Sequence, residues 1–515
     1  MMPRRARWPV HGVAGLALLG SLLALPAATD ARSWSAGPRL AVGRQLHTAT
    51  PLTGTRILVA GGLRSRGPTG SSEIFDERVR RWTRAGSLGT PRLAHAAAGL
   101  FGGKVLAVGG GTLSLGSEPS YLASAEIYDP ATNRWTRSAS AATARANHTA
   151  TLLRDGRVLV AGGLNSFGPG LASAEIYSPA TNRWASAGRM RDARFHHTAT
   201  LLPDGRVLIA GGHSLTGGGS TVALAGAELY DPASNSWAPA PRMSVARDNH
   251  TATLMPGGRV LVAGGGSRTR GFVRSSEVYD PSSNRWSSAG RMREPRGFHA
   301  MTLLPDRRVL ALGGFNDCGA LSGAELYSPA TGRWSRTRSL RRPRAHASAT
   351  AFPSGQVLVA GGSTFDGLIL RSGELLNPGR SDRTGPQLCR LTMRPQRLRA
   401  ARSGPSTGRG ATVRYRVNER GSVRFGVRRL VPGRVGGGRC RAARGRVPRN
   451  LRCVRSLRVR GSFRVRSRTG RNRFRFSGRL GGRTLSPGNY RLLARPFDRR
   501  RNAGETVDVT IRIRR

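Results

Sequence analysis

One sequence phrase recurs seven times in the chain and limits the folds open to it. Each copy contains a Gly-Gly pair and a later glutamate, and six copies end with a tryptophan. The pairs lie 48 to 53 residues apart and begin at Gly61, Gly109, Gly162, Gly211, Gly264, Gly313 and Gly361. The glutamates are Glu73, Glu126, Glu175, Glu228, Glu277, Glu325 and Glu374. The tryptophans are Trp82, Trp135, Trp184, Trp237, Trp286 and Trp334.

The tryptophan that is missing from the seventh copy is found before the first copy. No tryptophan follows Glu374, whereas Trp34 precedes the first glycine pair. A linear array of units has no reason to share one unit between its two ends, but a closed ring does. The pattern therefore predicts a ring of seven units, in which a strand near the start of the chain completes the last unit.

Each copy predicts four β-strands. "HTATLL" alternates, "RVLVAGG" is apolar and β-branched, "AEIYDP" ends at a turn signal, and "RW" opens the last strand. Four strands in about 50 residues are typical of a propeller blade. We expect the tryptophan to pack between neighbouring blades. We also expect each repeat glutamate to contact the repeat arginine or backbone N–H groups, because an unpaired buried carboxylate is costly.

The repeat resembles the kelch motif, which combines a glycine pair, a spaced Glu-x-Tyr and a spaced Trp. The resemblance covers residues 33–378 and implies a seven-bladed kelch β-propeller, closed by the N-terminal strand. Together with the region that follows, the layout is similar to galactose oxidase. That enzyme family ligates copper with two tyrosines and two histidines, which include an adjacent Tyr-His pair. This sequence contains no Tyr-His pair, so we expect no copper and no other cofactor.

Residues 388–515, which follow a linker at residues 379–387, differ from the repeats in composition and pattern. Apolar residues alternate with arginine, as in Val423, Phe425 and Val427, which predicts short strands with one inward face. Six or seven such strands are typical of an immunoglobulin-like β-sandwich. The fold class is therefore all-β. Residues 386–515 contain 38 arginines and four acidic residues, which favours an anionic polymer, such as a wall glycan, a lipid surface or nucleic acid, as partner. Inward aromatic residues argue against sequence-specific nucleic-acid binding.

Residues 1–31 have the features of a secretory signal peptide. Arg4, Arg5 and Arg7 precede the apolar stretch 13–25, and cleavage is expected after Ala28 or Ala31. An uncleaved anchor is the alternative. The prediction is a protein that is secreted or at the cell surface, with no transmembrane segment after signal removal.

The four cysteines fit disulfides in an exported chain. Cys440 and Cys453 lie 13 residues apart and form the preferred pair. Cys318 and Cys389 then pair with each other or remain free.

Most histidines occupy one repeat position. Six of them follow a repeat arginine by three residues: His47, His95, His148, His197, His250 and His299. In the seventh copy the spacing shortens, to Arg344 and His346. A ring of histidines could bind a metal, but a residue that recurs once per blade more simply has the same structural role in each blade. His196 and His213 lie outside this pattern.

Function is expected in the loops between the second and third strands, on the same face as the blade-to-blade loops. The candidate ligand-binding residues in these loops are Phe167, His213, Arg268, Arg270, Phe272, Phe315, Asp317, Phe365 and Asp366. We assign no catalytic and no metal residue. The sequence favours a non-enzymatic binding or adhesion protein for a glycan, a protein or an anionic surface polymer. The alternatives are an extracellular carbohydrate-active enzyme, and a protein whose functional half is the arginine-rich region.

Overall fold

A computed structural model describes two parts of the chain. The first is residues 33–377, except 113–119, 166–169, 216–220 and 268–270. The second is residues 388–514, except 400–410, 418–420, 437–438, 443–451, 469, 481–482, 499–502 and 504–505. The predicted signal peptide and linker lie outside these ranges. Within them, no helix has the length and apolar character needed to cross a membrane.

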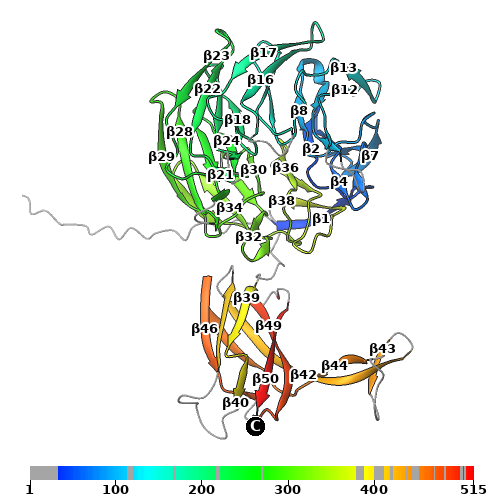
Figure 1. Cartoon of the computed structure of the whole chain (residues 1–515), viewed down its shortest axis with the longest axis vertical. Coiled ribbons are helices and arrows are strands. Elements are labelled where there is room, and N and C mark those ends of the chain that lie inside the picture. The colour runs from blue at the N-terminus through cyan, green and yellow to red at the C-terminus, as the bar shows by residue number, and fades with distance from the viewer. Residues whose placement is uncertain are drawn as a thin grey trace, which may run out of the picture.

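Seven antiparallel sheets of four strands stand around a common axis (Figure 1). The strands of the first three sheets, from the axis outward, are β2 (Thr48–Pro51), β3 (Arg56–Ala60), β6 (Ser72–Asp76) and β7 (Arg81–Ala85); β8 (Ala96–Gly99), β9 (Val105–Val108), β12 (Ala125–Asp129) and β13 (Arg134–Ser138); β14 (Thr149–Leu152), β15 (Val158–Ala161), β16 (Ser173–Ser178) and β17 (Arg183–Arg189). The strands of the next three are β18 (Thr198–Leu201), β19 (Val207–Ala210), β22 (Ala227–Asp231) and β23 (Ser236–Ala240); β24 (Thr251–Leu254), β25 (Val260–Ala263), β28 (Ser275–Asp280) and β29 (Arg285–Arg291); β30 (Ala300–Leu303), β31 (Val309–Leu312), β34 (Ala324–Ser328) and β35 (Arg333–Arg336).

The seventh blade is shared between the two ends of the propeller, as the sequence predicts. It consists of β36 (Ser348–Ala351), β37 (Val357–Ala360), β38 (Ser372–Asn377) and, outermost, β1 (Ser33–Arg39). Trp34 lies opposite Leu376 in this sheet, and its indole N–H donates to the Arg338 carbonyl of the sixth blade, 2.8 Å away. The innermost strand of each blade contacts both neighbours, and β2 contacts β36. The ring is therefore closed.

The blades pack through their second strands and their tryptophans. All residues of β9, β15, β19, β25, β31 and β37 are buried. Trp184 packs on Tyr177 of its own blade, with ring centroids 5.0 Å apart, and its N–H donates to the Ala139 carbonyl beside the preceding blade at 2.7 Å. Trp237 has the same contacts, with Tyr230 and Ala187. The prediction of a tryptophan between neighbouring blades is confirmed.

The glycine pair is required by the next blade as well as by its own. Gly61 and Gly62 have φ angles of 64° and 99°. A Cβ on Gly61 would lie 2.7 Å from both the Arg92 carbonyl oxygen and the His95 ring of the second blade. A Cβ on Gly62 would lie 2.8 Å from the His47 Cβ. No side chain fits between these atoms, so the pair is conformationally and sterically fixed.

The C-terminal domain contains two larger sheets. One is β39 (Leu388–Arg394), β41 (Ala411–Val417) and β46 (Gly470–Phe476). The other follows the order β40 (Arg397–Arg399), β50 (Val507–Arg514), β49 (Gly488–Asp498), β42 (Gly421–Gly436) and β43 (Arg439–Ala442), and both β44 (Arg452–Arg458) and β45 (Phe463–Ser467) pair with β42. The short strands β47 (Arg479–Leu480) and β48 (Arg483–Thr484) form a hairpin. Residues of both sheets share one hydrophobic core, which includes Val413, Phe425 and Leu492. The domain is thus a two-sheet β structure around one core.

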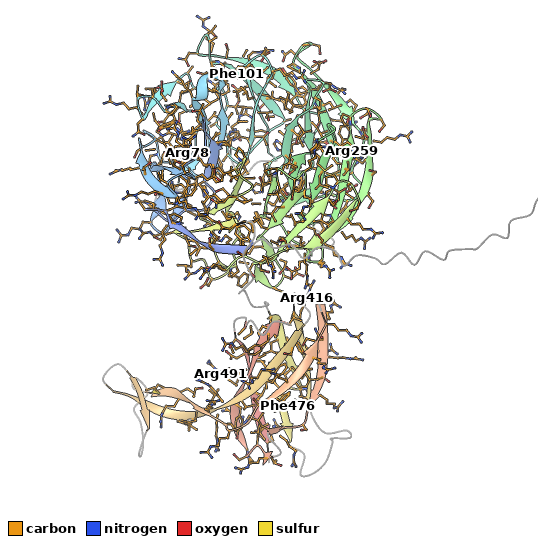
Figure 2. The ribbon with its side chains drawn as sticks, turned by 180° about the vertical axis from the view of Figure 1, so that it is seen from behind. Arg78, Phe101, Arg259, Arg416, Phe476 and Arg491 are labelled. Carbon is orange, nitrogen blue, oxygen red and sulfur yellow. A yellow bond between two sulfur atoms is a disulfide. The ribbon has the colours of Figure 1, made fainter. Side chains whose placement is uncertain are left out.

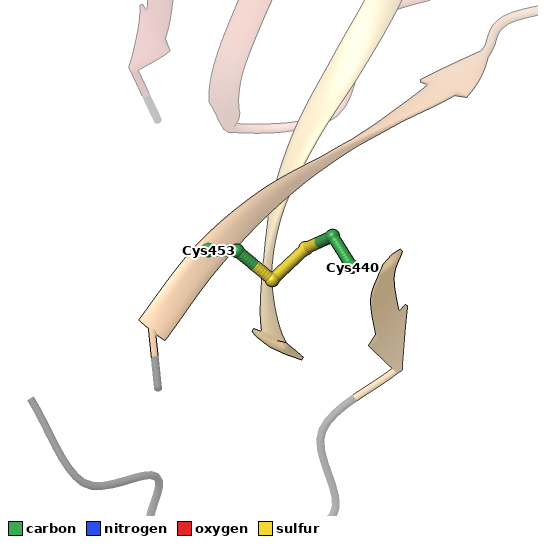
Figure 3. The surroundings of a disulfide bond; sticks show 2 residues. All are labelled: Cys440 and Cys453. Atoms are coloured by element: carbon green, nitrogen blue, oxygen red, sulfur yellow. A yellow bond between two sulfur atoms is a disulfide. The ribbon is translucent and has the colours of Figure 1, made fainter. Parts of the chain in front are cut away.

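A disulfide joins Cys440 and Cys453, as predicted, and links β43 to β44 beside β42 (Figure 3). Cys318 is disulfide-bonded as well, and no described cysteine is free. The free alternative for Cys318 is therefore wrong. The side chain of Cys389 lies outside the described residues.

Candidate functional site

The seven repeat arginines and glutamates form seven buried ion pairs. In each blade the guanidinium lies 2.6 to 3.0 Å from the glutamate carboxylate. Arg247 also donates to the carbonyls of Gly264 and Ser275, and Glu277 accepts backbone N–H groups from Ser244 and Val245. The predicted pairing is confirmed. Because the same buried pair recurs in all seven blades, these charges hold the scaffold together, and the repeat carboxylates already have partners.

The repeat histidines join neighbouring blades. The imidazole Nε2 of His47, His95, His197, His250 and His299 lies 2.8 to 3.1 Å from a Thr or Ser hydroxyl at the start of the innermost strand of the preceding blade. Burial, and then repulsion from the nearby arginine, lower the pKa of His47 to about 3. Burial also lowers the pKa of His250 to about 3. A neutral imidazole that bonds a hydroxyl has a structural role, as the sequence suggested.

His346 is not the histidine of the seventh copy in register. Its φ is 53°, and Ala347 occupies the repeat histidine position, where its Cβ faces Gly362 as the His47 Cβ faces Gly62. The matching hydroxyl position in the sixth blade is Ala300. The shortened spacing therefore marks a lost structural histidine, and His346 performs another role.

A ring of residues with positive φ surrounds the axis, one from each blade-to-blade loop. They lie directly before the repeat histidine position: Leu46, Ala94, Asn147, His196, Asn249, Phe298 and His346. At six junctions the N–H donates to the carbonyl of the preceding ring residue, at 2.9 to 3.2 Å. The residue before each ring residue pairs with the residue after a glycine pair, as in Phe195 with His213. The two sets of loops therefore lie on one face, as predicted.

The blades differ from one another at these positions. The first three blades carry Leu46, Ala94 and Asn147 on the ring. The last four carry His196, Asn249, Phe298 and His346, so aromatic and imidazole rings occur only in this half of the ring. We define the mouth cluster as His196, His213, Asp248, Phe298, Phe315 and His346. Residues that differ where the scaffold repeats are candidates for function.

Aromatic and imidazole rings form a continuous arc through the mouth cluster. Phe195 stacks on His213 at 5.2 Å with an interplanar angle of 3°. His346 lies 4.6 Å from Phe298 and 5.6 Å from Phe315 between ring centroids. Phe365, which is 76% exposed, continues the arc beyond Phe315 at 6.5 Å. The arc presents partly exposed ring surface around the axis.

One hydrogen-bonded histidine–aspartate pair lies beside this arc. The His213 Nδ1 is 3.0 Å from the Asp248 Oδ2, and the Asn249 side chain donates to the Asp248 Oδ1 at 2.9 Å. Burial acts to raise the pKa of Asp248, but the hydrogen bonds from His213 and Asn249 outweigh it and hold the pKa below its usual value. Burial lowers the pKa of both His196 and His346 to about 4. At neutral pH His196 and His346 are therefore neutral imidazoles, and Asp248 is a carboxylate.

The structure gathers only some of the predicted loop residues. His213 and Phe315 belong to the mouth cluster and Phe365 lies next to it. Phe272 packs beside Gly297, where an added Cβ would lie 2.8 Å from the phenyl ring. Asp317 lies in the turn of the hairpin β32 (Phe315–Asn316) to β33 (Gly319–Ala320). Asp366 accepts a hydrogen bond from the Thr364 hydroxyl within its own loop, which lowers its pKa. Phe167, Arg268 and Arg270 lie outside the described residues.

The sequence analysis missed Phe195, Asp248, Phe298 and the role of His346. These residues lie in the blade-to-blade loops, whereas the candidate residues that the sequence indicated lie in the loops after the second strand. The signal that identifies them is the disagreement between copies at the two positions after the repeat arginine.

The described residues do not fit a copper radical centre. Four repeat tyrosines, Tyr128, Tyr177, Tyr230 and Tyr279, are buried in the blades and donate to an asparagine of the outer turn. Tyr415 and Tyr490 belong to the C-terminal core. In the part of the chain that the structure describes, no three His, Cys, Asp or Glu side chains are grouped for metal binding.

Comparisons with known proteins agree with this architecture. The family model described as the Kelch motif matches residues 92–141, 144–191 and 249–293. Kelch-like protein 34 of Homo sapiens is 34% identical over 125 residues, which are 24% of this chain and 19% of that protein. An F-box/kelch-repeat protein of Arabidopsis thaliana is 36% identical over 83 residues, 16% of this chain and 23% of that protein. The chain thus spans less than a quarter of the length of these relatives.

A solved structure shares the fold over nearly the whole chain. It is a fungal alcohol oxidase of the AA5 family in complex with copper, at 16% identity and a TM-score of 0.53, covering 93% of this chain and 98% of that one. At this identity the likeness concerns the fold.

Proposed function

For this kelch-repeat β-propeller, we propose that the mouth cluster binds a neutral carbohydrate. The observation that carries the proposal is the convergence of an aromatic arc and the His213–Asp248 pair on one face, at the positions where the seven blades differ. The chain would act as a binding or adhesion protein. A carbohydrate ligand also fits the export that the first 31 residues predict.

The rings of the cluster suit the apolar faces of sugars. Phe298, Phe315 and His346 lie within 6.2 Å of one another between centroids and are only partly buried. Phe365 adds exposed ring surface at the edge. Aromatic side chains provide large contact area at low conformational cost, so this arc supports stacking of one or two sugar rings.

The polar groups of the cluster suit hydroxyls and disfavour anions. Asp248 accepts hydrogen bonds and carries a negative charge at neutral pH, and each neutral imidazole offers one donor and one acceptor. An anionic ligand would be repelled by Asp248. A neutral ligand with many hydroxyls matches both the charge and the donor–acceptor pattern.

Titration calorimetry of the full chain against neutral hexose oligosaccharides tests this proposal. Phe298→Asn removes the ring and keeps a residue that tolerates positive φ; we expect a loss of about tenfold or more in affinity. Ala94→Asn makes the matched change on the opposite side of the ring and should leave affinity unchanged. Failure of every neutral oligosaccharide to bind, or equal affinity for the two variants, would contradict the proposal.

A second function is favoured by one contact, the 3.0 Å approach of His213 to Asp248. A carboxylate that orients an imidazole is the arrangement of a general base, so the mouth could hydrolyse or otherwise convert its carbohydrate. Glycoside hydrolysis commonly uses two carboxylates, and the mouth cluster has one. Release of reducing ends that Asp248→Asn abolishes, without loss of binding, would establish the enzyme and replace the pure binding role.

A further inference from the structure

The outward face of the seven-stranded C-terminal sheet carries a second concentration of charge, which the mouth cluster does not use. We name this the arginine face; its members are exposed and comprise Arg424, Arg428, Arg458, Arg464, Arg466, Arg491 and Arg495. The intervening residues Val423, Phe425, Leu492 and Ala494 point into the core. Alternation along the strands therefore directs the arginines to solvent. Arg491 of this face is labelled in Figure 2.

Strand register arranges six of these arginines in two rows. Arg424 of β42 lies opposite Arg464 of β45 on one side and Arg495 of β49 on the other. In the second row, Arg428 lies between Arg458 of β44 and Arg491 of β49. Each row crosses three neighbouring strands. Neighbouring strands lie about 4.7–4.9 Å apart, so each row presents positive charges at a short, regular spacing.

This arrangement works against the stability of the sheet. Like charges directly opposite one another on neighbouring strands are destabilising. Asp508 lies 3.7 Å from Arg491, at the end of the second row. A row of arginines that costs stability in the free protein would be stabilised by an anionic ligand laid across it. The geometry thus has the form of a binding surface.

We propose that the arginine face binds a linear acidic polysaccharide that runs across the strands. A sugar unit of an extended chain advances by about one strand spacing, so one carboxylate or sulfate per unit meets successive arginines of a row. Arginine presents a planar fork that matches carboxylate and sulfate oxygens. Ser422, opposite Arg466, and Thr510, opposite Arg491, add hydroxyl groups beside the charges.

Two other polyanionic partners fit this face less well. Single-stranded nucleic acid is bound through aromatic side chains on which bases stack. The one aromatic residue outward on this face, Phe497, is covered by the guanidinium groups of Arg464 and Arg495, at 5.2 and 5.9 Å. A lipid surface is engaged through protruding apolar side chains. The exposed Val454 and Leu457 pair with Pro432 and Arg429, outside the two rows.

The test compares two triple variants of the full chain for binding to immobilised polygalacturonate. The row variant is Arg424→Ser, Arg464→Ser and Arg495→Ser. The control variant, Arg414→Ser, Arg473→Ser and Arg475→Ser, removes the same charge from the three-stranded sheet, where Arg414 and Arg473 are also paired across strands. At about 50 mM salt, we expect the row variant to lose about tenfold or more in affinity and the control about threefold or less.

Three results would overturn the proposal. Equal losses in both variants would mean that net charge alone drives binding. Equal affinity of the parent for single-stranded DNA would assign the face to nucleic acid, and equal affinity for anionic lipid vesicles would assign it to a membrane. The mouth cluster is probed with neutral oligosaccharides and the arginine face with an acidic one. Either proposal can therefore be contradicted without affecting the other.

A thermal melt guards against misfolding. The row variant should melt at or above the temperature of the parent, because the substitutions relieve repulsion. If it melts lower, the Arg424→Lys, Arg464→Lys and Arg495→Lys variant replaces it, with charge preserved and the planar fork removed. That variant should lose severalfold in affinity, and an unchanged affinity would contradict the proposal.

Discussion

The repeat arginines in the core of the propeller differ from the exposed arginines of the C-terminal domain in the groups that surround their charge. In the propeller, Arg247 is fully buried, bonds Glu277 at 2.7 Å and donates to three carbonyls. In the C-terminal domain, Arg424 is exposed and faces two other arginines. The same side chain is therefore paired with a buried carboxylate in one region and lies among like charges in the other.

This comparison separates scaffold from candidate function. A buried charge pair that recurs in each of the seven blades supports the fold. Charges placed against their own kind, and side chains that differ between repeats, point to a ligand. The two regions should therefore respond differently to changes in pH and to loss of single charges.

Of the changes considered, a mildly acidic pH should produce the largest difference in stability between the propeller and the C-terminal domain. Burial lowers the pKa of eight propeller histidines: His47, His95, His148, His196, His197, His250, His299 and His346. Residues 388–515 contain no histidine. In the unfolded chain these histidines bind protons near pH 6.5, whereas in the folded propeller they stay neutral. The full stability of the propeller is therefore kept above about pH 6.5 and is lost as the pH falls towards 4.

Hydrogen exchange of the intact chain between pH 7 and pH 4, corrected for intrinsic exchange rates, measures this effect. Protection should fall in the propeller strands before it falls in β42 and β49. Loss of protection in the C-terminal sheets first would contradict this assignment of the acid-sensitive groups.

Breaking one buried ion pair should have the next largest effect. Glu277→Gln leaves the Arg247 charge buried without its carboxylate, and we expect a loss of about 3–5 kcal/mol in the free energy of unfolding. The control is Asp204→Asn, which breaks the exposed pair with Arg206 and should cost about 1 kcal/mol or less. Tryptophan fluorescence during urea unfolding reports on the propeller, because residues 388–515 contain no tryptophan. Equal losses in the two variants would show that burial does not decide the role of these pairs.

A smaller gain is expected from one missing hydrogen bond. The Nε2 of His148 is buried without a partner, because Ala96 occupies the position where five other blades have Thr or Ser. Ala96→Thr should supply the hydroxyl and stabilise the propeller by about 0.5–1.5 kcal/mol. Ala300→Thr is the matched control, which should not raise the free energy of unfolding, because Ala347 occupies the repeat histidine position in the next blade. Urea unfolding of both variants distinguishes the specific bond from a general effect of threonine.

The sequence was sufficient to predict the propeller because the same physical requirements are repeated. Trp34 outside the first copy predicted the strand β1 in the last blade, and the repeated Glu and Arg predicted the buried pairs. Each such requirement is local to a blade and its neighbour. Periodicity alone therefore specified blade number, ring closure and the pairing of charges.

The candidate site could be predicted only in part, because it depends on how loops from different blades meet. His213 and Asp248 are 35 positions apart in the chain and belong to different blades, and only the ring geometry brings them to 3.0 Å. His346 was assigned to the repeat although it follows Arg344 by two positions and Ala347 occupies the third; its φ of 53° places it with the other ring residues. The alternation of apolar residues and arginine predicted that the C-terminal arginines face outward. The two rows of the arginine face depend on which strands pair and in what register, and the sequence pattern does not define this.

Hydrogen exchange of two single variants tests the central claim most directly, namely that propeller arginines hold the fold and C-terminal row arginines do not. In Arg247→Ser, amides of β25 and β28 should exchange faster than in the parent. In Arg424→Ser, amides of β42 and β49 should remain as protected as in the parent or more so. Unchanged protection in Arg247→Ser, or faster exchange of β42 and β49 in Arg424→Ser, would contradict the account.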